Sequence, residues 1–290
     1  MSLSVTPECL ICHFQRTLKK AQTLGDDRMA MRFAKELMQI YISAPEDVSS
    51  PWYNPSVEAL FQKFYGVEPD QYREEKEQAN RFVMDRLEQI QSMVEQSADP
   101  VFAALRLAIL GNYLDFAALQ GQISFEKLEE MLRDALNMEL DEGVYESLCA
   151  DLAKGKHLLY LTDNAGEIGF DRVLAEQIHK RYPHLEIVFC VRGGIIINDA
   201  TREDAEIVGI PFKVIDNGNL ISGTELTQLG QEAREAMDTA DVIISKGMAN
   251  TETLYGCGYN IYYAFLVKCV RFAQEFGKPL FTPMLIREKR

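Results

Sequence analysis

The sequence has little positive charge, few cysteines and no long hydrophobic run, and each shortage excludes a class of protein. Thirty Lys and Arg residues stand against 44 Asp and Glu residues, which gives a net charge of −14. Binding to nucleic acid or to an anionic membrane surface needs the opposite balance, so we expect neither partner. No stretch reaches the roughly 18 apolar residues of a membrane-spanning helix, and the N-terminus lacks a signal-peptide pattern. We therefore expect a cytoplasmic protein.

Six cysteines in 290 residues are too few for a disulfide framework. Two of them, Cys9 and Cys12, form a Cys-x-x-Cys pair near the N-terminus. The pair could be redox-active, one half of a metal site, or simply buried and inert, and the sequence leaves these readings open.

Three common enzyme signatures are missing as well. The chain has no Gly-x-x-x-x-Gly-Lys-[Ser/Thr] loop for nucleotide phosphates and no Gly-x-Ser-x-Gly nucleophile elbow. It also lacks the Gly-x-Gly-x-x-Gly turn of dinucleotide-binding enzymes. P-loop enzymes, α/β-hydrolases and enzymes that use NAD or FAD are therefore disfavoured.

What is present divides into two halves with different patterns. Up to about residue 152, apolar residues recur at helical spacing without interleaved strands, which predicts an all-helical domain over residues 1–152. Thr6-Pro7-Glu8 is a typical helix start within it. From residue 153, short apolar runs alternate with helical segments. This alternation predicts a Rossmann-like α/β domain over residues 153–290, with three α/β/α layers and a mostly parallel sheet.

Polar residues collect where the predicted strands end. In a parallel α/β sheet, ligands bind beyond the carboxyl ends of the strands, so we expect these residues to converge. The predicted strands are 158–161, 186–191, 211–215, 241–245 and 261–267. In chain order, the polar residues that follow them are Asp163, Asn164, Glu167, Arg192, Asp199, Asp216, Lys246, Gly247, Asn250, Glu252 and Lys268.

The chemistry of these residues suits a metal and a phosphate. Carboxylate and amide oxygens are ligands for a hard divalent cation such as Mg²⁺ or Mn²⁺, and Asp163, Asn164 and Asp199 could supply three. Lys246 could bind a phosphate as a point charge. Metal and lysine together would neutralise the charge that develops during phosphoryl transfer. The residues alone indicate metal-assisted hydrolysis of a phosphorylated small molecule.

Several of these residues also have simpler structural explanations. Glu167 could only complement the dipole of the helix that it begins, and Asp216 could only form an Asx-turn before Gly218. In the helical half, Asn112 and Asp115 share one face of an otherwise apolar helix. We expect that helix to lie against the mouth of the pocket.

Four segments resemble the damage-control phosphatases, a family catalogued earlier as domain of unknown function 89. They are TDNAGE (162–167), VRGGIIINDAT (191–201), SKGMANTETL (245–254) and GNYLD (111–115). The N-terminal Cys-x-x-Cys resembles the compact microbial branch. The resemblance covers essentially the whole chain. It implies an α/β/α domain joined to a helical domain, and a metal-dependent phosphatase that acts on sugar phosphates or damaged phosphorylated metabolites.

The resemblance also implies roles for individual residues. A divalent metal ion (Mg, Mn, Co or Ni) would be held by Asp163, Asn164 and Asp199. Asp163, Asp199 and Lys246 would be catalytic, with Lys246 and the backbone at Gly247 holding the phosphate. The other residues implied to line the substrate pocket are Glu167, Arg192, Asp216, Asn250, Glu252, Asn112 and Asp115. Whether a water or Asp163 itself attacks phosphorus is left open.

The sequence therefore predicts a phosphomonoester hydrolase acting on small phosphorylated metabolites, with the oligomeric state left open. The alternative is a non-catalytic, metal-dependent binding protein or sensor for a phosphorylated ligand. Phosphate release that depends on added metal would distinguish the enzyme from the sensor.

Overall fold

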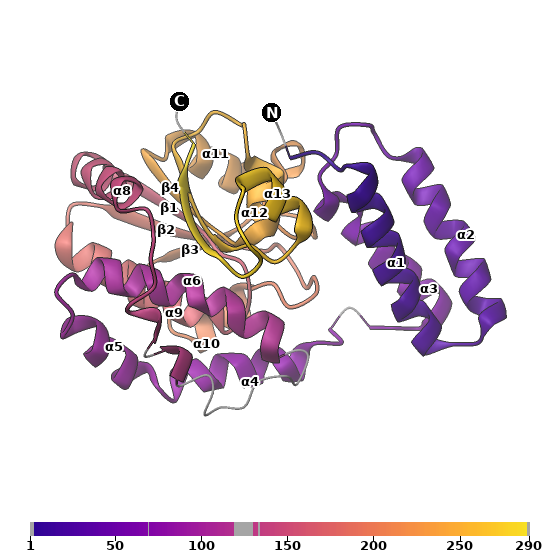
Figure 1. Cartoon of the computed structure of the whole chain (residues 1–290), viewed down its shortest axis with the longest axis horizontal. Coiled ribbons are helices and arrows are strands. Elements are labelled where there is room, and N and C mark those ends of the chain that lie inside the picture. Colours follow the sequence, from indigo (N-terminus) through magenta and orange to yellow (C-terminus); the bar gives the residue numbers. More distant parts are fainter. Residues whose placement is uncertain (1–2, 69, 119–129, 133, 289–290) are drawn as a thin grey trace.

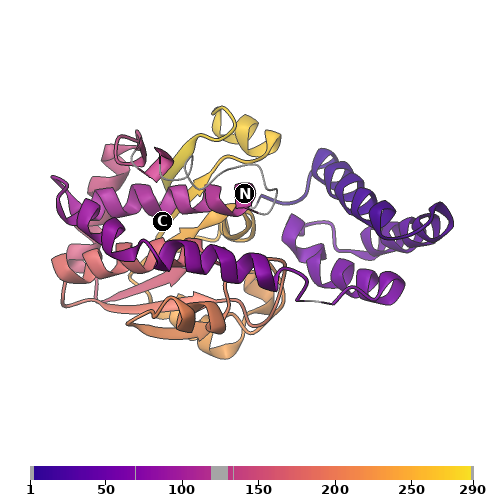
Figure 2. The ribbon, with the colours of Figure 1, turned by 90° about the horizontal axis from the view of Figure 1, so that it is seen from below.

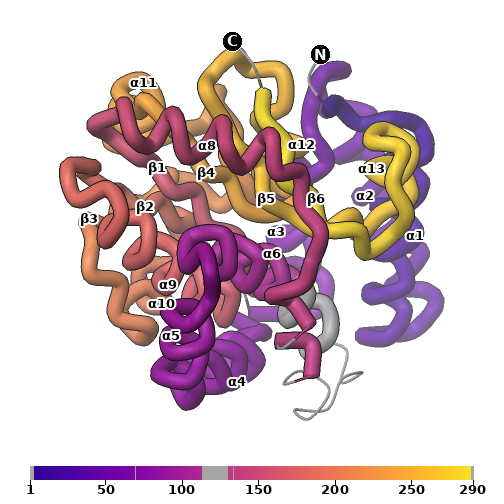
Figure 3. Tube along the Cα trace, turned by 60° about the vertical axis from the view of Figure 1, so that its left-hand side comes forward, coloured from indigo at the N-terminus to yellow at the C-terminus, as the bar shows by residue number. Residues whose placement is uncertain are grey.

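A six-stranded sheet lies at the centre of the computed structural model, which describes residues 3–68, 70–118, 130–132 and 134–288, without the side chains of 113–118. The strand order is β3-β2-β1-β4-β5-β6, with β3 and β6 at the two edges (Figure 3). Strands β1 to β5 are parallel, and β6 runs antiparallel to β5. The strands are β1 (His157–Leu161), β2 (Glu186–Val191), β3 (Lys213–Asp216), β4 (Val242–Lys246), β5 (Ile261–Leu266) and β6 (Pro283–Arg287).

Helices cover both faces of this sheet, which confirms the predicted α/β fold with a mostly parallel sheet (Figure 1). The helices are α1 (Pro7–Leu24), α2 (Asp27–Ser43), η1 (Ser50–Tyr53), α3 (Asn54–Tyr65), α4 (Arg73–Met84), α5 (Leu87–Glu95), α6 (Pro100–Ala118), α8 (Glu142–Lys154), α9 (Glu167–Arg181), α10 (Arg202–Ile207), η2 (Leu226–Gln228), α11 (Gln231–Thr239), α12 (Gly247–Leu254) and α13 (Val270–Phe276).

The period-2 alternation of strand side chains builds two cores, one on each face. Leu158 and Tyr160 of β1 point into the core that α6, α8 and α9 complete. Leu159 and Leu161 point to the other face, where α11, α12 and α13 pack. Because successive residues of a strand face opposite sides, a strand buried on both faces must be apolar throughout. This is why the parallel strands appear in the sequence as short continuous apolar runs.

The helical half of the chain contains two different units. Helices α1, α2 and α3 enclose their own core around Phe33 and Phe61, and stand to one side of the sheet (Figures 1 and 2). Helices α4 to α6 instead contribute Val83, Ile90 and Leu107 to the core of the sheet. The expected boundary near residue 152 therefore coincides with a change of secondary structure and not with a gap between two cores.

Residues 101–112 of helix α6 are mostly apolar and mostly buried. Among the residues described, no helix combines the length and apolarity that a bilayer crossing requires.

Gly111 lies within α6 at a position where a Cβ atom would be 3.0 Å from Phe170 and 3.2 Å from the Glu167 side chain. Glycine at this position therefore lets α6 approach the start of α9, next to the polar strand ends.

All five strands expected from the sequence are present, with ends within two residues of those expected. Thr6 caps α1 by accepting a hydrogen bond from the backbone N–H of Cys9. Asp85 and Arg86 separate α4 from α5, and α11 begins at Gln231. Neither α12 nor the edge strand β6 was expected from the sequence.

Candidate active site

The strand order creates the crevice in which the polar residues meet. Chain connections leave β1 toward β2 on one side, whereas β4 lies on its other side, so the order reverses between β1 and β4. Ligands of open α/β sheets bind at such a reversal, beyond the carboxyl ends of the strands. Asp163 follows β1 and Gly247 follows β4, so both lie at this point.

Backbone hydrogen bonds join the loop after β1 to the loop after β2. The N–H of Ala200 donates to the carbonyl of Asp163 at 2.8 Å, and the N–H of Ala165 donates to the carbonyl of Asn198 at 2.9 Å. Asn164 and Asp199 form an isolated antiparallel β-bridge. Two loops that are 35 residues apart in the chain therefore hold Asp163, Asn164 and Asp199 together, as the sequence led us to expect.

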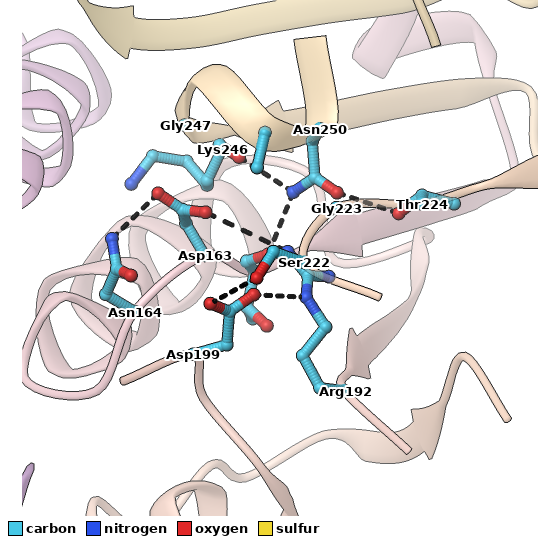
Figure 4. A network of polar contacts seen from close by, with 12 residues as sticks. Asp163, Asn164, Arg192, Asp199, Ser222, Gly223, Thr224, Lys246, Gly247 and Asn250 are labelled. Atoms are coloured by element: carbon cyan, nitrogen blue, oxygen red, sulfur yellow. Dashed lines mark hydrogen bonds and ion pairs between the residues drawn. The ribbon is translucent and has the colours of Figure 1, made fainter. Parts of the chain in front are cut away.

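A buried guanidinium forms ion pairs with both aspartates (Figure 4). Nε of Arg192 donates to Oδ2 of Asp199 at 2.6 Å, and Nη2 lies 3.8 Å from Oδ1 of Asp163. Arg192 is 1% exposed, and neither Nη1 nor Nη2 has a hydrogen-bond partner. Buried unpaired donors are costly, so these two nitrogens mark a place where an anionic ligand would be stabilised.

The pKa values of both aspartates are raised by their surroundings. Burial, reinforced by the carboxylates of Glu167 and Asp199, raises the pKa of Asp163 well above its ordinary value, while Arg192 and Lys268 act in the opposite direction. Burial also raises the pKa of Asp199, against the lowering effect of Arg192 and of the hydrogen bond from Ser222. Crowded buried carboxylates of this kind are stabilised in the charged form by added positive charge.

Two side-chain amides tie Asp163 to Glu167. Nδ2 of Asn112 donates to Oδ2 of Asp163 at 2.8 Å and to Oε2 of Glu167 at 2.9 Å. Nδ2 of Asn164 donates to the same two oxygens at 2.7 and 3.1 Å. The amide oxygen of Asn112 is buried and has no hydrogen-bond partner. Asn112 is thus the residue by which α6, from the helical half of the chain, reaches the site.

Lys246 lies in the site but does not offer its ammonium group to a ligand. Its Nζ donates to Oε1 of Glu167 at 2.7 Å, to Oδ1 of Asp171 at 2.6 Å and to the carbonyl of Ala108 at 2.8 Å. Lysine has three N–H donors, so all are used, and the side chain is fully buried. Burial lowers the pKa of Lys246, but Asp171 and Glu167 outweigh it, and the pKa lies above its ordinary value. The expected contact of Lys246 with phosphate has no donor available in this arrangement.

Gly247 allows the start of α12 to approach Asp163. Its φ is +77°, a left-handed conformation that favours glycine. A Cβ atom at this position would overlap the carboxylate of Asp163. The close approach explains a glycine here and places the N-terminal end of α12 beside the carboxylate.

Asn250 is fully buried, but it acts as a connector between loops. Its Nδ2 donates to the carbonyls of Thr162 and Lys246 at 2.9 and 2.7 Å, and its Oδ1 accepts from Thr224 at 2.8 Å. These hydrogen bonds join the ends of β1 and β4 to the loop after β3. They also occupy the polar side-chain atoms of Asn250, which are therefore not available to bind a substrate.

Two other expected pocket residues, Asp216 and Glu252, do not join the cluster. Asp216 accepts from Arg202 at 2.7 Å and from the N–H of Gly218 at 3.0 Å, which is the Asx-turn alternative. The charged groups that face Glu252 are Arg271 and Arg16, in the region between α12, α13 and α1. The side chain of Asp115 lies outside the described residues.

Two residues of the site were missed by sequence reasoning. Asp171 is fully buried and accepts from Lys246 and from the hydroxyl of Tyr160 at 2.8 Å. Its position four residues after Glu167 on α9 was the available signal, because i and i+4 share a helix face. Ser222 donates to Oδ1 of Asp199 at 3.2 Å, and nothing in the sequence distinguished it from other loop serines.

The residues at the joined loops fit a hard divalent cation. Across the described part of the chain, no cluster of three or more His, Cys, Asp or Glu side chains is arranged to hold a metal ion. Two buried carboxylates and an amide are nevertheless an oxygen-rich donor set, and cations such as Mg²⁺ retain several waters. Burial and the neighbouring carboxylates raise the pKa of Asp163, and a bound cation would act against both effects.

Comparison with known proteins gives consistent matches along the chain. Residues 5–282 match the damage-control phosphatase ARMT1-like domain. An uncharacterized protein of Methanocaldococcus jannaschii is 35% identical over 99% of this chain and 96% of its own length. A damage-control phosphatase of Archaeoglobus fulgidus is 34% identical over 95% of this chain and 96% of its own length. The crystal structure of a DUF89 family protein from Pyrococcus horikoshii matches with a TM-score of 0.83 and 29% identity, over 99% of both chains.

Proposed function

The chain belongs to the family of damage-control phosphatase ARMT1-like domains, and from this membership we propose that it is a metal-dependent phosphomonoester hydrolase. Its substrates are damaged or other small phosphorylated metabolites. The observation that carries the proposal is the meeting of Asp163 and Asp199 around the buried Arg192, at the reversal point of the sheet. The two carboxylates would bind a cation, and the guanidinium N–H groups without hydrogen-bond partners would bind the phosphate ester.

Asp163, Asn164 and Asp199 would hold the metal. When bound there, a divalent cation supplies charge neutralisation for the phosphoryl group and lowers the pKa of a coordinated water. The protein contributes the fixed geometry. The β-bridge between Asn164 and Asp199 sets the spacing of the two loops, and Ser222 and Arg192 orient the Asp199 carboxylate.

Arg192 and Lys268 are better placed than Lys246 to bind the phosphate. Both Nη atoms of Arg192 are buried and have no hydrogen-bond partner. Lys268 follows β5 at the same edge of the sheet, and its charge acts on Asp163. A guanidinium can bind two phosphate oxygens at once, and a lysine adds a point charge. The backbone at Gly247, where α12 begins, is a third element that favours an anion.

The attacking group is either a water beside Asp163 or Oδ1 of Asp163 itself. In the second case the carboxylate would form a bond to phosphorus as the ester oxygen leaves, and water would then cleave the aspartyl-phosphate. We propose the first role, in which Asp163 binds the metal beside the attacking water. A burst of alcohol product on rapid mixing, with acid-stable label on the protein, would contradict it.

Removal and return of metal tests the proposal. Protein freed of metal with a chelator is expected to release no phosphate from a panel of small phosphomonoesters, and Mn²⁺, Co²⁺, Ni²⁺ or Mg²⁺ should restore release. Asp163→Asn and Asp199→Asn should each lower kcat by at least about 100-fold, since loss of a metal ligand removes the main electrostatic stabilisation. The matched control is Asp241→Asn, because Asp241 lies at the opposite end of β1 and binds the N–H groups of Lys156 and His157. Turnover that persists after chelation would contradict metal dependence.

A further inference from the structure

The buried ammonium group of Lys246 joins two carboxylates that belong to α9. Lys246, Glu167 and Asp171 are each fully buried, and the two ion pairs measure 2.7 and 2.6 Å. Removing one partner from such a buried group leaves an uncompensated charge, which is strongly unfavourable. The three side chains therefore form one unit, and no member can reorient alone.

This unit is connected directly to the metal-binding carboxylate. One oxygen of Glu167 faces Lys246, and the other accepts from the amides of Asn112 and Asn164. The same two amides donate to Oδ2 of Asp163. Because ionised carboxylates only accept hydrogen bonds, both amides must present their NH₂ groups to Glu167 and Asp163. The carbonyl oxygens of both amides are thereby turned away from the two carboxylates, where they can serve as metal ligands.

We propose that Lys246 and Asp171 are positioning residues that fix Glu167, and through Glu167 orient the Asn112 and Asn164 amides for metal binding. This inference rests on the proposed function of the site. It assigns Lys246 to the organisation of the oxygen donors and not to the phosphate. It also gives a purpose to Asp171, which the sequence motifs did not single out.

The contacts of Asp171 support this role. Oδ1 of Asp171 accepts from both Lys246 and the hydroxyl of Tyr160, so the aspartate fixes the position of the ammonium group against β1. The carbonyl of Ala108, on α6, accepts the third N–H of Lys246. Since Asn112 lies one turn further along α6, the same ammonium group also positions the helix that carries it.

The inference is tested by titrating metal-free protein with Mn²⁺ and following free Mn²⁺ by electron paramagnetic resonance. Asp171→Asn keeps the shape of the side chain but removes its charge, and Lys246→Met removes the ammonium group. Each is expected to weaken Mn²⁺ binding about 10- to 100-fold, as loss of groups that orient metal ligands commonly does. At saturating Mn²⁺ the KM for a phosphomonoester should stay within about twofold of wild type. The double variant should be no worse than the more severe single variant, because both act on one unit.

The matched control is Ser245→Ala. Ser245 precedes Lys246 on β4 and is fully buried, and its hydroxyl has no hydrogen-bond partner. The variant should bind Mn²⁺ as wild type does. If circular dichroism shows that Lys246→Met does not fold, Asp171→Asn alone decides the question.

Two results would overturn the inference. The first is an unchanged Mn²⁺ affinity in Asp171→Asn. The second is a Lys246→Met variant whose KM for the ester rises while its Mn²⁺ affinity is normal, as a direct phosphate ligand would produce. Failure of the proposed function gives a different result, because wild-type protein itself would then neither bind Mn²⁺ nor release phosphate.

Discussion

At the scale of single residues, the space beside Asp163 is controlled by the absence of a side chain at Gly247. The left-handed φ of +77° and the overlap of a Cβ atom with the Asp163 carboxylate are independent reasons for glycine. The first is a cost in the free energy of folding, about 1–2 kcal/mol for a residue that is not glycine. The second acts on the site, because the carboxylate must move to make room.

Gly247→Ala should therefore damage activity more than stability. We expect a loss of kcat/KM of about 10- to 100-fold, with a weaker apparent affinity for Mn²⁺, because Asp163 is displaced from its partners. The urea midpoint should fall only as far as the backbone strain requires. Gly258→Ala is the matched control, since Gly258 also has a positive φ, of +83°, but nothing lies within 4 Å of its added Cβ atom. Equal losses of activity in both variants would contradict the explanation.

The sequence allowed us to predict which residues meet at the sheet edge, but not every contact that they make. Asp163, Asn164 and Asp199 could be grouped because the carboxyl ends of neighbouring parallel strands meet at one edge. The role of Lys246 could not be predicted, because a lysine at a strand end can point toward a ligand or toward the helix beside it. That choice depends on Glu167 and Asp171, whose direction is set by how α9 packs on the sheet.

At the scale of elements, α4 braces both loops of the site from the helical half. The Asn80 side chain accepts from the N–H of Gly166 at 2.7 Å and donates to Asp204 at 2.8 Å. Lys76, one turn earlier, forms an ion pair with Asp204 at 2.8 Å. Gly166 begins α9 and Asp204 completes the capping box of α10, so one helix holds the starts of two others.

Asn80→Ala is expected to destabilise the fold and loosen the two loops together. Removal of the amide leaves the Gly166 N–H and one oxygen of Asp204 without partners, at a cost of about 3 kcal/mol in the free energy of unfolding. Urea denaturation measures the loss. Gln96→Ala, at the exposed end of α5, is the matched control and should change the free energy by less than about 0.5 kcal/mol. A near-native stability for Asn80→Ala would show that α4 does not brace the loops.

Some helices and strands can be recognised from their own residues, whereas others depend on their neighbours in the fold. Strands β1, β2, β4 and β5 are short apolar runs because both of their faces are buried, and each was located from its own residues. Strand β3, at the sheet edge, is only partly buried and includes Lys213 and Asp216. The edge strand β6 pairs with β5, and its apolar run is only Met284, Leu285 and Ile286, next to the end of the chain. Helix α12 begins directly at the end of β4, so its first residues look like a strand-end loop.

At the scale of the whole molecule, Glu252 lies where the α1–α3 unit meets the rest of the chain. Burial raises the pKa of Glu252 from an ordinary value of 4.5 to about 7, although Arg271 and Arg16 act to lower it. Arg16 belongs to α1 and Arg271 to α13, so charges from both parts act on the carboxyl. A nearby hydrogen bond runs from Arg271 to the carbonyl of Leu3 at 3.1 Å.

The stability of the molecule should consequently depend on pH through Glu252. A carboxyl group whose pKa is raised by folding contributes stability that is complete below pH 4.5 and is lost as the pH rises through about 7. Glu252→Gln stays neutral, so it should match wild type near pH 4 and melt about 2–4 °C higher at pH 8. Scanning calorimetry at both values measures the difference. Glu146→Gln, an exposed acid on α8, should show no such dependence, and a lower melting temperature for Glu252→Gln at pH 8 would contradict the sign.

The charge of the whole molecule agrees with the class of substrate. A chain with a net charge of −14 repels polyanions, yet the described site places Arg192 and Lys268 near Asp163. Local positive charge and a divalent cation can therefore admit one small phosphate ester where a nucleic acid is excluded.

The central claim is that Asp163, Asn164 and Asp199 hold one divalent cation between the loops after β1 and β2. The most direct measurement is the anomalous scattering of Mn²⁺ in crystals of the protein grown with the metal. We expect a strong peak in contact with side-chain oxygens of all three residues, and its loss in Asp199→Asn. A peak at another place, or none in crystals of a protein that Mn²⁺ activates, would show that these residues do not hold the cation.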